Sequence, residues 1–201
     1  GVNDPKWPRV TKIIFESIPE GPGVTQHNFG DPFEPSSLFE EIAQMRLELD
    51  PSDANLDPNN YDSFENFKHA LEKDLEEKQA IINEIKSKLL RMLDGANVSI
   101  SKKDKIQLSA HYGLQNFTET GCIIIDKVNR EYCKKILVVL PNQSHPVHAH
   151  IIKEETFELL SGDCTLNLNG TDINMVKGEP KVIFRGVKHS FRSKNGCVVE
   201  E

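Results

Sequence analysis

Two histidines and one glutamate in the second half of the chain have the types and the spacing to bind a metal ion. His148 and His150 are two positions apart, Glu155 follows them, and His189 lies further along the chain. Side chains two positions apart in a β-strand point to the same face, so we expect the first two imidazoles to converge. Glu155 opens the next β-like run, and a hairpin would bring its carboxylate beside the rings. A 2-His-1-carboxylate set suits Fe, Mn, Co, Ni or Zn and leaves coordination positions for water or substrate.

Other titratable groups near this set are candidates for acid–base chemistry or for ordinary surface roles. Lys153 and Glu154 adjoin the ligand positions and are either loop charges or groups at the mouth of a site. Glu200 and Glu201 follow a β-like run, so alternation should turn one inward and the other outward. His145 follows the turn PNQS and could line the mouth of the site. The remaining histidines lack such spacing and are expected to be structural: His27, His69 and His111.

The residues beyond Gly95 have the pattern of β-structure. Short runs rich in Ile, Val, Leu and Thr recur there, with turn sequences such as PNQS, LNGTD and KGEP between them. Closely spaced strands without intervening helices are typical of an antiparallel sandwich or barrel. The predicted strands are KIQLSA, CIIIDKV, KKILVVL, PVHAHI, ETFELLS, CTLNLN, DINMVK, KVIFRG and GCVVEE.

The first half is predicted to hold an arm and two helices. Segments rich in Pro and Gly surround the β-like runs VTKIIF and VTQHNF. Ser37 and Glu40 have capping-box spacing and begin a short amphipathic helix, which Pro51 terminates. We expect residues 1–95 to form this N-terminal arm with its short strands, one short helix and one long helix, and residues 96–201 to form the barrel.

The long helix is predicted from Phe64 to Leu93. Asp62 with Glu65 supplies a start signal and Gly95 a stop signal. Lys78 should bury its methylene stem and extend its ammonium group to solvent. We favour packing of the apolar stripe on the chain's own domain over a dimerisation seam, because most such stripes pack in the core of their own domain. The stripe comprises Phe67, Leu71, Leu75, Ile82, Ile85 and Leu89.

Composition and charge exclude several classes of protein. The chain has 24 Lys and Arg against 31 Asp and Glu, a formal net charge of −7, which argues against binding nucleic acid or an anionic membrane. No apolar run approaches the ~18 residues that a membrane span requires. With neither a secretion signal nor a CxxC pair, we expect a reduced, cytoplasmic protein. Its cysteines are expected to be structural: Cys122, Cys133, Cys164 and Cys197.

Two segments of the β-rich half resemble the two motifs of the cupin superfamily. HAHIIKEETFELLSG has the form H-x-H-x4-E-x6-G and is similar to the first motif, with Gly162 at its end. GEPKVIFRGVKHSF is similar to the second, with Gly178, Gly186 and His189 in their places. Phe184 stands where the second motif often has Pro, and Ser193 where it often has Asn.

The cupin resemblance implies both a fold and a ligand set. Cupins are double-stranded, jelly-roll β-barrels, so a mainly β fold with an N-terminal helical extension is expected, with the resemblance covering roughly residues 105–201. It also implies that a divalent ion, Mn, Fe, Zn, Co or Ni, is held inside the barrel. The implied ligands are His148, His150, Glu155 and His189.

The segment NREYCKKILVVLPNQSHPVHAHIIKEETFELLSGD resembles more closely the cupins of the D-lyxose isomerase type and cupin modules associated with sialic-acid (N-acetylneuraminate) synthases. The first resemblance implies a metal-dependent aldose–ketose isomerase that acts on a small-molecule sugar through an enediolate. Candidates for moving the proton between C1 and C2 are Glu155, Lys153, Glu200 and Glu201. We also expect a homodimer.

Two other functions remain open from the sequence. One is a non-catalytic metal- or sugar-binding cupin module linked to sialic-acid-type sugar biosynthesis. The other is an Fe(II) dioxygenase, since the same ligand set can hold that ion. An isomerase needs a second ionisable group near the open coordination positions, whereas a binding module could be lined by neutral polar and apolar residues alone.

Overall fold

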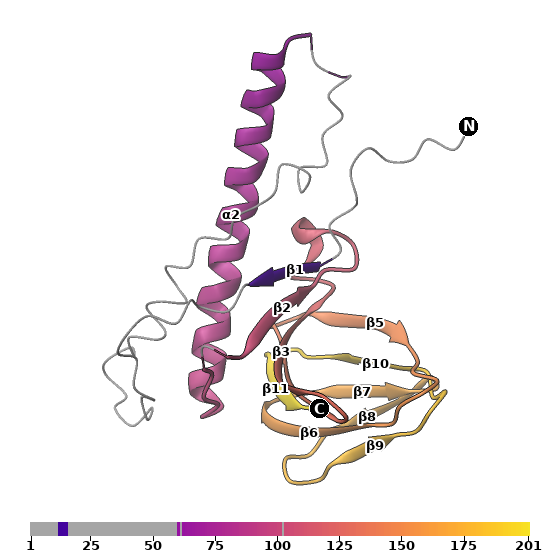
Figure 1. Ribbon diagram of the computed structural model, residues 1–201. Helices are drawn as coiled ribbons and strands as arrows, with labels where there is room; N and C mark the ends of the chain where they lie inside the picture. The colour runs from indigo at the N-terminus through magenta and orange to yellow at the C-terminus, as the bar shows by residue number, and fades with distance from the viewer. Residues whose placement is uncertain (1–11, 16–59, 61, 102) are drawn as a thin grey trace, which may run out of the picture.

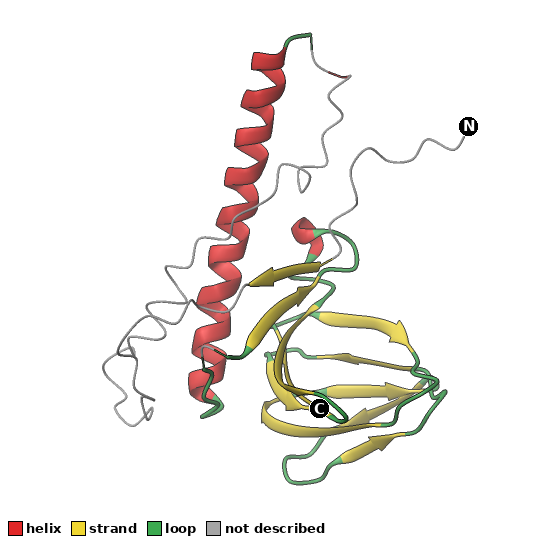
Figure 2. Ribbon diagram, viewed as in Figure 1, coloured by secondary structure: helices red, strands yellow, loops and turns green. Residues whose placement is uncertain are grey.

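The computed structural model describes residues 12–15, 60, 62–101 and 103–201, in which a long helix precedes an antiparallel β-barrel (Figures 1 and 2). The helix is α2 (Phe64–Gly95), and a short 3-10 helix, η3 (Leu114–Asn116), lies between the second and third strands. The strands are β1 (Lys12–Phe15), β2 (Lys105–Ser109), β3 (Cys122–Asn129), β4 (Cys133–Val139), β5 (Ser144–His148), β6 (Glu155–Gly162), β7 (Thr165–Leu168), β8 (Thr171–Asn174), β9 (Lys181–Ile183), β10 (His189–Arg192) and β11 (Cys197–Glu200).

The strands form two sheets whose pairings are all antiparallel. The larger sheet has the order β1-β2-β3-β4-β11-β6-β9, and the smaller has the order β5-β10-β7-β8. Strands that follow one another in sequence, such as β4, β5 and β6, alternate between the sheets, as the chain does in a jelly roll. The predicted fold class, a mainly β cupin barrel with a helix on its N-terminal side, is confirmed.

The central strands of the larger sheet are apolar on both faces, which explains their near-continuous hydrophobic sequences. On β4, Ile136 and Val138 belong to a core shared with α2. Leu137 and Val139 alternate with them and belong to a second core, which lies between the two sheets and includes Leu166 of β7. The larger sheet is therefore the middle layer, with the helix on one face and the barrel interior on the other.

Helix α2 forms as predicted over almost the same residues. Ser63, rather than Asp62, is the N-cap, and its side chain accepts a hydrogen bond from the backbone N–H of Asn66 at 3.2 Å. Lys78 is mostly buried and pairs with Asp74 at 2.8 Å, so its ammonium group ends in an ion pair on the helix surface.

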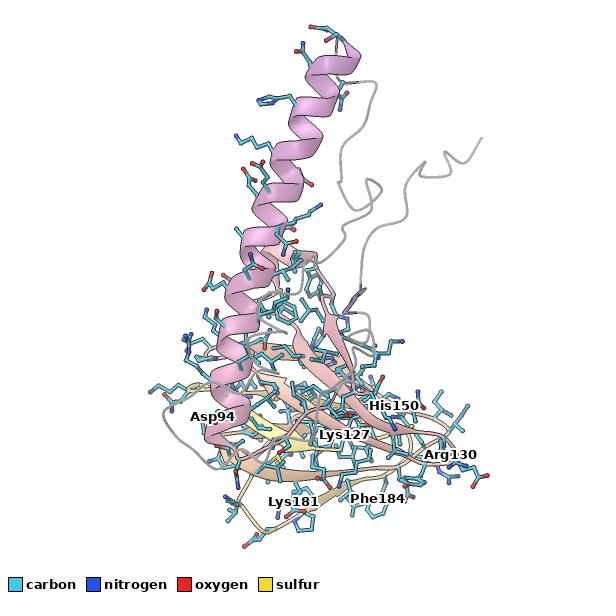
Figure 3. The ribbon with its side chains drawn as sticks, turned by 60° about the vertical axis from the view of Figure 1, so that its left-hand side comes forward. Asp94, Lys127, Arg130, His150, Lys181 and Phe184 are labelled. Carbon is cyan, nitrogen blue, oxygen red and sulfur yellow. The ribbon has the colours of Figure 1, made fainter. Side chains whose placement is uncertain are left out.

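The C-terminal half of α2 supplies the buried part of the predicted stripe. Ile82, Ile85 and Leu89 are fully buried, and so is Leu93 one turn further. The N-terminal turns of the helix extend beyond the barrel strands, as two views show (Figures 1 and 3). Three stripe residues of those turns have side chains outside the described set: Phe67, Leu71 and Leu75.

Two predictions about the strands need correction. The run after His189 was not predicted as a strand, yet it forms β10, because Phe191 alternates with exposed Arg192 and packs in the barrel core. The predicted strand PVHAHI is displaced, since β5 begins at Ser144 and ends at His148. The predicted strand VTKIIF is represented by β1. The run VTQHNF and the short helix that begins at Ser37 lie outside the described residues.

The described part of the chain contains no helix with both the length and the apolar composition needed to cross a membrane.

We predict that Leu89→Ala lowers the free energy of unfolding by about 2–5 kcal/mol, because it leaves a cavity between α2 and the larger sheet. Denaturant unfolding followed by circular dichroism would measure the change. Arg91→Ala on the exposed side of the same helix is the control and should stay within about 0.5 kcal/mol of the parent. Equal stability of Leu89→Ala and Arg91→Ala would contradict the packing of α2 on the sheet.

Candidate metal centre

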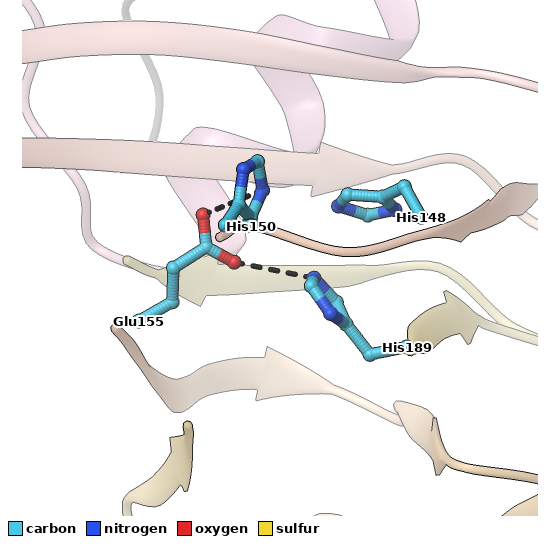
Figure 4. A group of neighbouring side chains, drawn as sticks. All are labelled: His148, His150, Glu155 and His189. Carbon is cyan, nitrogen blue, oxygen red and sulfur yellow. Dashed lines mark ion pairs between the residues drawn. The ribbon is translucent and has the colours of Figure 1, made fainter. Parts of the chain in front are cut away.

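The four residues singled out by their spacing and by the cupin resemblance come together at one end of the barrel (Figure 4). His148 is the last residue of β5 and His189 the first of β10, and these two are register partners in the smaller sheet. Glu155 is the first residue of β6 in the larger sheet. The site therefore lies where the two sheets face each other.

Two expectations about how these residues come together were wrong. His150 does not share a strand face with His148, because β5 ends at His148 and His150 lies in the segment that follows. The carbonyl of His150 instead accepts a hydrogen bond from the N–H of Gly186 at 2.8 Å, which anchors this segment to the turn before β10. Nor does a hairpin position Glu155, since β5 and β6 belong to different sheets.

Backbone carbonyls fix the orientation of two of the imidazoles. The Nδ1 atom of His148 lies 3.0 Å from the carbonyl oxygen of Pro146, and Nδ1 of His189 lies 3.0 Å from that of Val187. When Nδ1 carries the proton and donates it to the carbonyl, Nε2 keeps its lone pair for a ligand. The sequence alone gave no indication of these carbonyl partners.

The donor atoms are close enough to share one ion. One ligand atom from each of the four residues lies within 4.8 Å of all the others. Donors bound at about 2.0–2.2 Å to a common zinc-like ion are separated by at most about 4.4 Å, so an adjustment of a few tenths of an ångström would suffice. The rings of His148 and His189 have centroids only 4.0 Å apart.

A buried nitrogen without a hydrogen-bond partner also fits a metal. Nε2 of His189 is fully buried and lacks a hydrogen-bond partner in the described structure. It lies 3.2 Å from Oε2 of Glu155, as an ion pair without the alignment of a hydrogen bond, and Oε1 of the same carboxylate lies 3.0 Å from Nε2 of His150. A buried polar atom left in this way is costly, and a shared cation between these atoms would satisfy it.

The electrostatic environment favours the protonation state that a metal ligand needs at three of the four residues, with His189 as the exception. Burial lowers the pKa of both His148 and His150, which keeps the two imidazoles neutral. Burial disfavours the carboxylate of Glu155, but its contacts with His189 and Lys153 outweigh this and lower its pKa well below the ordinary value. Burial likewise opposes protonation of His189, yet the carboxylate of Glu155 raises its pKa. A carboxylate and neutral imidazoles are the forms that bind metal ions.

A chain of ion pairs leads from Glu155 into the interior of the barrel. Nζ of Lys153 lies 2.7 Å from Oε1 of Glu155 and 3.1 Å from Oε1 of Glu201. The same oxygen of Glu201 lies 3.0 Å from Nζ of Lys135. The side chain of Glu201 is only 11% exposed, so it is an inward-facing acid, as one of the two final glutamates was expected to be.

The structure does not bring Glu200 into this group. Alternation along β11 turns it to the other face of the strand, where it pairs with Lys134 at 2.9 Å. Lys134 and Lys135 alternate along β4 in the same way, with Lys134 paired with Glu200 and Lys135 with Glu201. Glu154, next to the ligand set in sequence, is solvent-exposed.

Two further histidines adjoin the site, one of which sequence reasoning left as structural. His145 stacks on Phe191 with ring centroids 4.7 Å apart and lies equally close to His148. Its Nε2 atom lies 3.0 Å from Nε2 of His111, which follows β2. Burial, reinforced by the neighbouring histidines, lowers the pKa of His145 to about 3, so this residue is neutral. Nothing in the spacing of His111 pointed to the site, because the contact joins residues far apart in sequence.

We predict that His148→Ala and Glu155→Gln each lower metal affinity by well over the ~10- to 100-fold typical of changes to groups that only support a ligand. The β-structure should persist, because apolar residues such as Leu166 and Val199 hold the barrel together. Elemental analysis and circular dichroism would measure the two effects. His69→Ala on the exposed surface of α2 is the control and should retain full metal content.

Full metal occupancy in both His148→Ala and Glu155→Gln would refute the ligand assignment. Loss of the β signal together with the metal would show instead that the ion maintains the fold.

Comparisons with known proteins place the chain near sugar isomerases. It is 33% identical over 101 residues to the D-lyxose/D-mannose isomerase of Thermosediminibacter oceani, covering 46% of this chain and 56% of that protein. It is 35% identical over 100 residues to the D-lyxose ketol-isomerase of a Thermofilum species, covering 45% of this chain and 55% of that protein. The chain thus spans about half the length of the curated relatives it matches. No protein-family profile matches it.

Solved structures with a partial likeness include cupins. A cupin-2 domain protein from Shewanella frigidimarina matches with a TM-score of 0.35 and 23% identity, over 38% of this chain and 74% of that one. A mutant L-ribose isomerase of Acinetobacter sp. DL28 in complex with L-ribose matches with a TM-score of 0.37 and 17% identity, over 40% of this chain and 57% of that one. The sequence matches, together with the two-sheet barrel, confirm the resemblance to cupins of the D-lyxose isomerase type.

Proposed function

We propose that this chain carries the active site of a metal-dependent aldose–ketose isomerase that acts on a small sugar. The observation that carries the proposal is the position of Lys153, whose ammonium group lies between the carboxylates of Glu155 and Glu201. Ionisable groups beside a metal-ligand set are what an isomerase requires for proton transfer.

The four clustered residues are assigned to the metal, and the ion pairs beside them to the proton. His148, His150, Glu155 and His189 would hold a divalent ion. Such an ion, when bound, supplies Lewis-acid polarisation of a sugar carbonyl and its neighbouring hydroxyl, which makes the adjacent C–H more acidic. The chain itself must then remove a proton from C2 and deliver it to C1, while the hydroxyl proton of O2 passes to O1 so that C2 becomes the carbonyl carbon.

We assign Glu201 and Lys153 different roles in this proton transfer, because one is a carboxylate and the other an ammonium group. Burial opposes the charged form of Lys153, but Glu155 and Glu201 outweigh it and raise the pKa of its ammonium group. Lys153 therefore remains protonated and suits the role of hydrogen-bond donor to a sugar oxygen. Glu201 is the carboxylate next to it that is not among the clustered donor atoms, so we assign Glu201 as the base that moves the carbon-bound proton. Glu155 is assigned to the metal alone.

The alternatives fit the lining of the site less well. A binding module could have only neutral groups beside the ligand set, whereas here Lys153, Glu201 and Lys135 form a continuous row of charges. An Fe(II) dioxygenase would share the ligand set, but its chemistry does not require a lysine–glutamate pair beside it. The names of the relatives, which refer to D-lyxose and D-mannose, make a free aldose the first substrate to test.

The direct experiment is aldose–ketose exchange in deuterated water. Protein purified without added metal is assayed for metal content and then supplied with D-lyxose, D-mannose and other aldoses. We expect metal-dependent formation of ketose with deuterium at C1, because a proton carried by a side chain exchanges with solvent. A metal-loaded protein that interconverts no sugar in the panel would defeat the proposal.

We predict that Glu201→Gln and Lys153→Met each lower kcat by at least about 100-fold, the lower end of a typical acid–base contribution, while metal content stays at the parent level. Steady-state kinetics and elemental analysis would separate the two effects. Glu200→Gln is a matched control from the next position in the chain, paired with Lys134 on the opposite face of β11, and should keep near-parent activity. Equal losses in Glu200→Gln and Glu201→Gln would remove Glu201 from its role.

A further inference from the structure

Polar side chains continue the row of charges away from the metal ligands, across the barrel-facing side of the larger sheet. Alternation puts Gln107 of β2 on the opposite face from Ile106 and Leu108, which pack against α2. On β3, Asp126 shares the face of Cys122 and Ile124, which pack in the barrel core. Gln107 and Asp126 therefore lie on the inner face, the same face as Lys135.

The strand register makes this row continuous. Asp126 is the direct cross-strand partner of Lys135, which places their Cα atoms about 4.5–5.5 Å apart. Lys135 in turn contacts Glu201, and Glu201 contacts Lys153 beside the metal ligands. A path of neighbouring polar groups thus runs from the candidate metal centre to Asp126.

Gln107 and Asp126 are joined in a way that leaves acceptor atoms available. The amide nitrogen of Gln107 donates a hydrogen bond to Oδ2 of Asp126. Gln107 is 5% exposed, and Asp126 is only half-buried, so its carboxylate retains access to solvent. Oδ1 of Asp126 and Oε1 of Gln107 take no part in this hydrogen bond. Both atoms are acceptors that suit hydroxyl groups.

We propose that Asp126 and Gln107 form a subsite for the distal hydroxyl groups of an open-chain sugar whose reacting end lies at the metal ligands. This inference rests on the proposed isomerase function, because that function fixes which end of the sugar meets His148, His150, Glu155 and His189. The two residues determine how long a sugar chain the site accepts and how tightly it holds it. They take no part in proton transfer.

A polyhydroxy chain is the ligand that this pair suits best. A carboxylate oriented by an amide accepts charge-assisted hydrogen bonds from hydroxyl groups, which are among the stronger hydrogen bonds. The other charged groups of the row, Lys135, Glu201 and Lys153, are already paired with one another. Within the described part of the chain, Asp126 is therefore the carboxylate of the row that forms no ion pair, and hydroxyl donors would complete its hydrogen bonding.

The test compares sugars of different length in Asp126→Asn and Gln107→Met, both loaded with metal and checked for parent-like metal content and melting temperature. For D-lyxose and D-mannose we expect KM to rise about 10- to 100-fold with kcat little changed, as for the loss of a hydrogen bond to a charged group. For D-glyceraldehyde, a three-carbon aldose that lacks the hydroxyl groups beyond C3, we expect no change in KM. Asp172→Asn, on the exposed surface of β8, is the matched control.

Binding of D-mannitol, an unreactive six-carbon polyol, is measured in parallel by calorimetry on the same proteins. We expect Asp126→Asn to weaken this binding by a similar factor, and Asp172→Asn to leave it unchanged. If the parent protein turns over no sugar but binds D-mannitol in an Asp126-dependent manner, the isomerase proposal fails and the subsite stands.

Three results would overturn the subsite. One is an equal rise in KM for D-glyceraldehyde and for the longer sugars, which would mean general damage to the site. The second is unchanged KM for the longer sugars in both variants. The third, decisive even without turnover, is D-mannitol affinity that is equal in the parent and in Asp126→Asn, or no D-mannitol binding by the parent.

Discussion

The buried carboxylate of Glu155 is the constraint on which the arrangement of this site depends. Its side chain is only 4% exposed, and an ionised carboxylate at such a position is costly unless charged or hydrogen-bonding partners surround it. His150, His189 and Lys153 are those partners, each within 3.2 Å of a carboxylate oxygen. Because His150 and Lys153 lie in the segment between β5 and β6, and His189 begins β10, one buried charge holds these two segments to the start of β6.

The two-sided apolar packing of the larger sheet stabilises the fold enough for the barrel to contain polar residues in its interior. Apolar residues fill both faces of β3, β4 and β11 over much of their length, and α2 covers the outer face. The inner face then changes from apolar to charged toward one end, at Lys135 on β4 and Glu201 after β11. The apolar end stabilises the fold, and the polar end carries the charged side chains beside the candidate metal centre.

Local patterns in the sequence predicted much of this architecture. The period of the apolar residues predicted α2, and β-like runs bounded by turns predicted most strands, since both signals depend only on near neighbours. The four clustered residues could be chosen in advance because two motifs carry them. How the fold brings them together could not be predicted, because contacts between distant residues decide whether β5 and β6 pair or lie in different sheets. The same reason hid His111, which contacts His145 across the barrel.

The charges beside the metal ligands nearly cancel, and this balance bears on what the site can do. Glu155 and Glu201 are matched by Lys135 and Lys153, and burial keeps His148 and His150 neutral. The side chains by themselves therefore offer little excess positive charge to an oxygen that becomes anionic during proton transfer from a sugar. Preorganised charge at such an oxygen is commonly the largest contribution to catalysis. Under the proposed function, that charge would come from a cation held by the clustered histidines, for which the neutral imidazoles of His148 and His150 are suited.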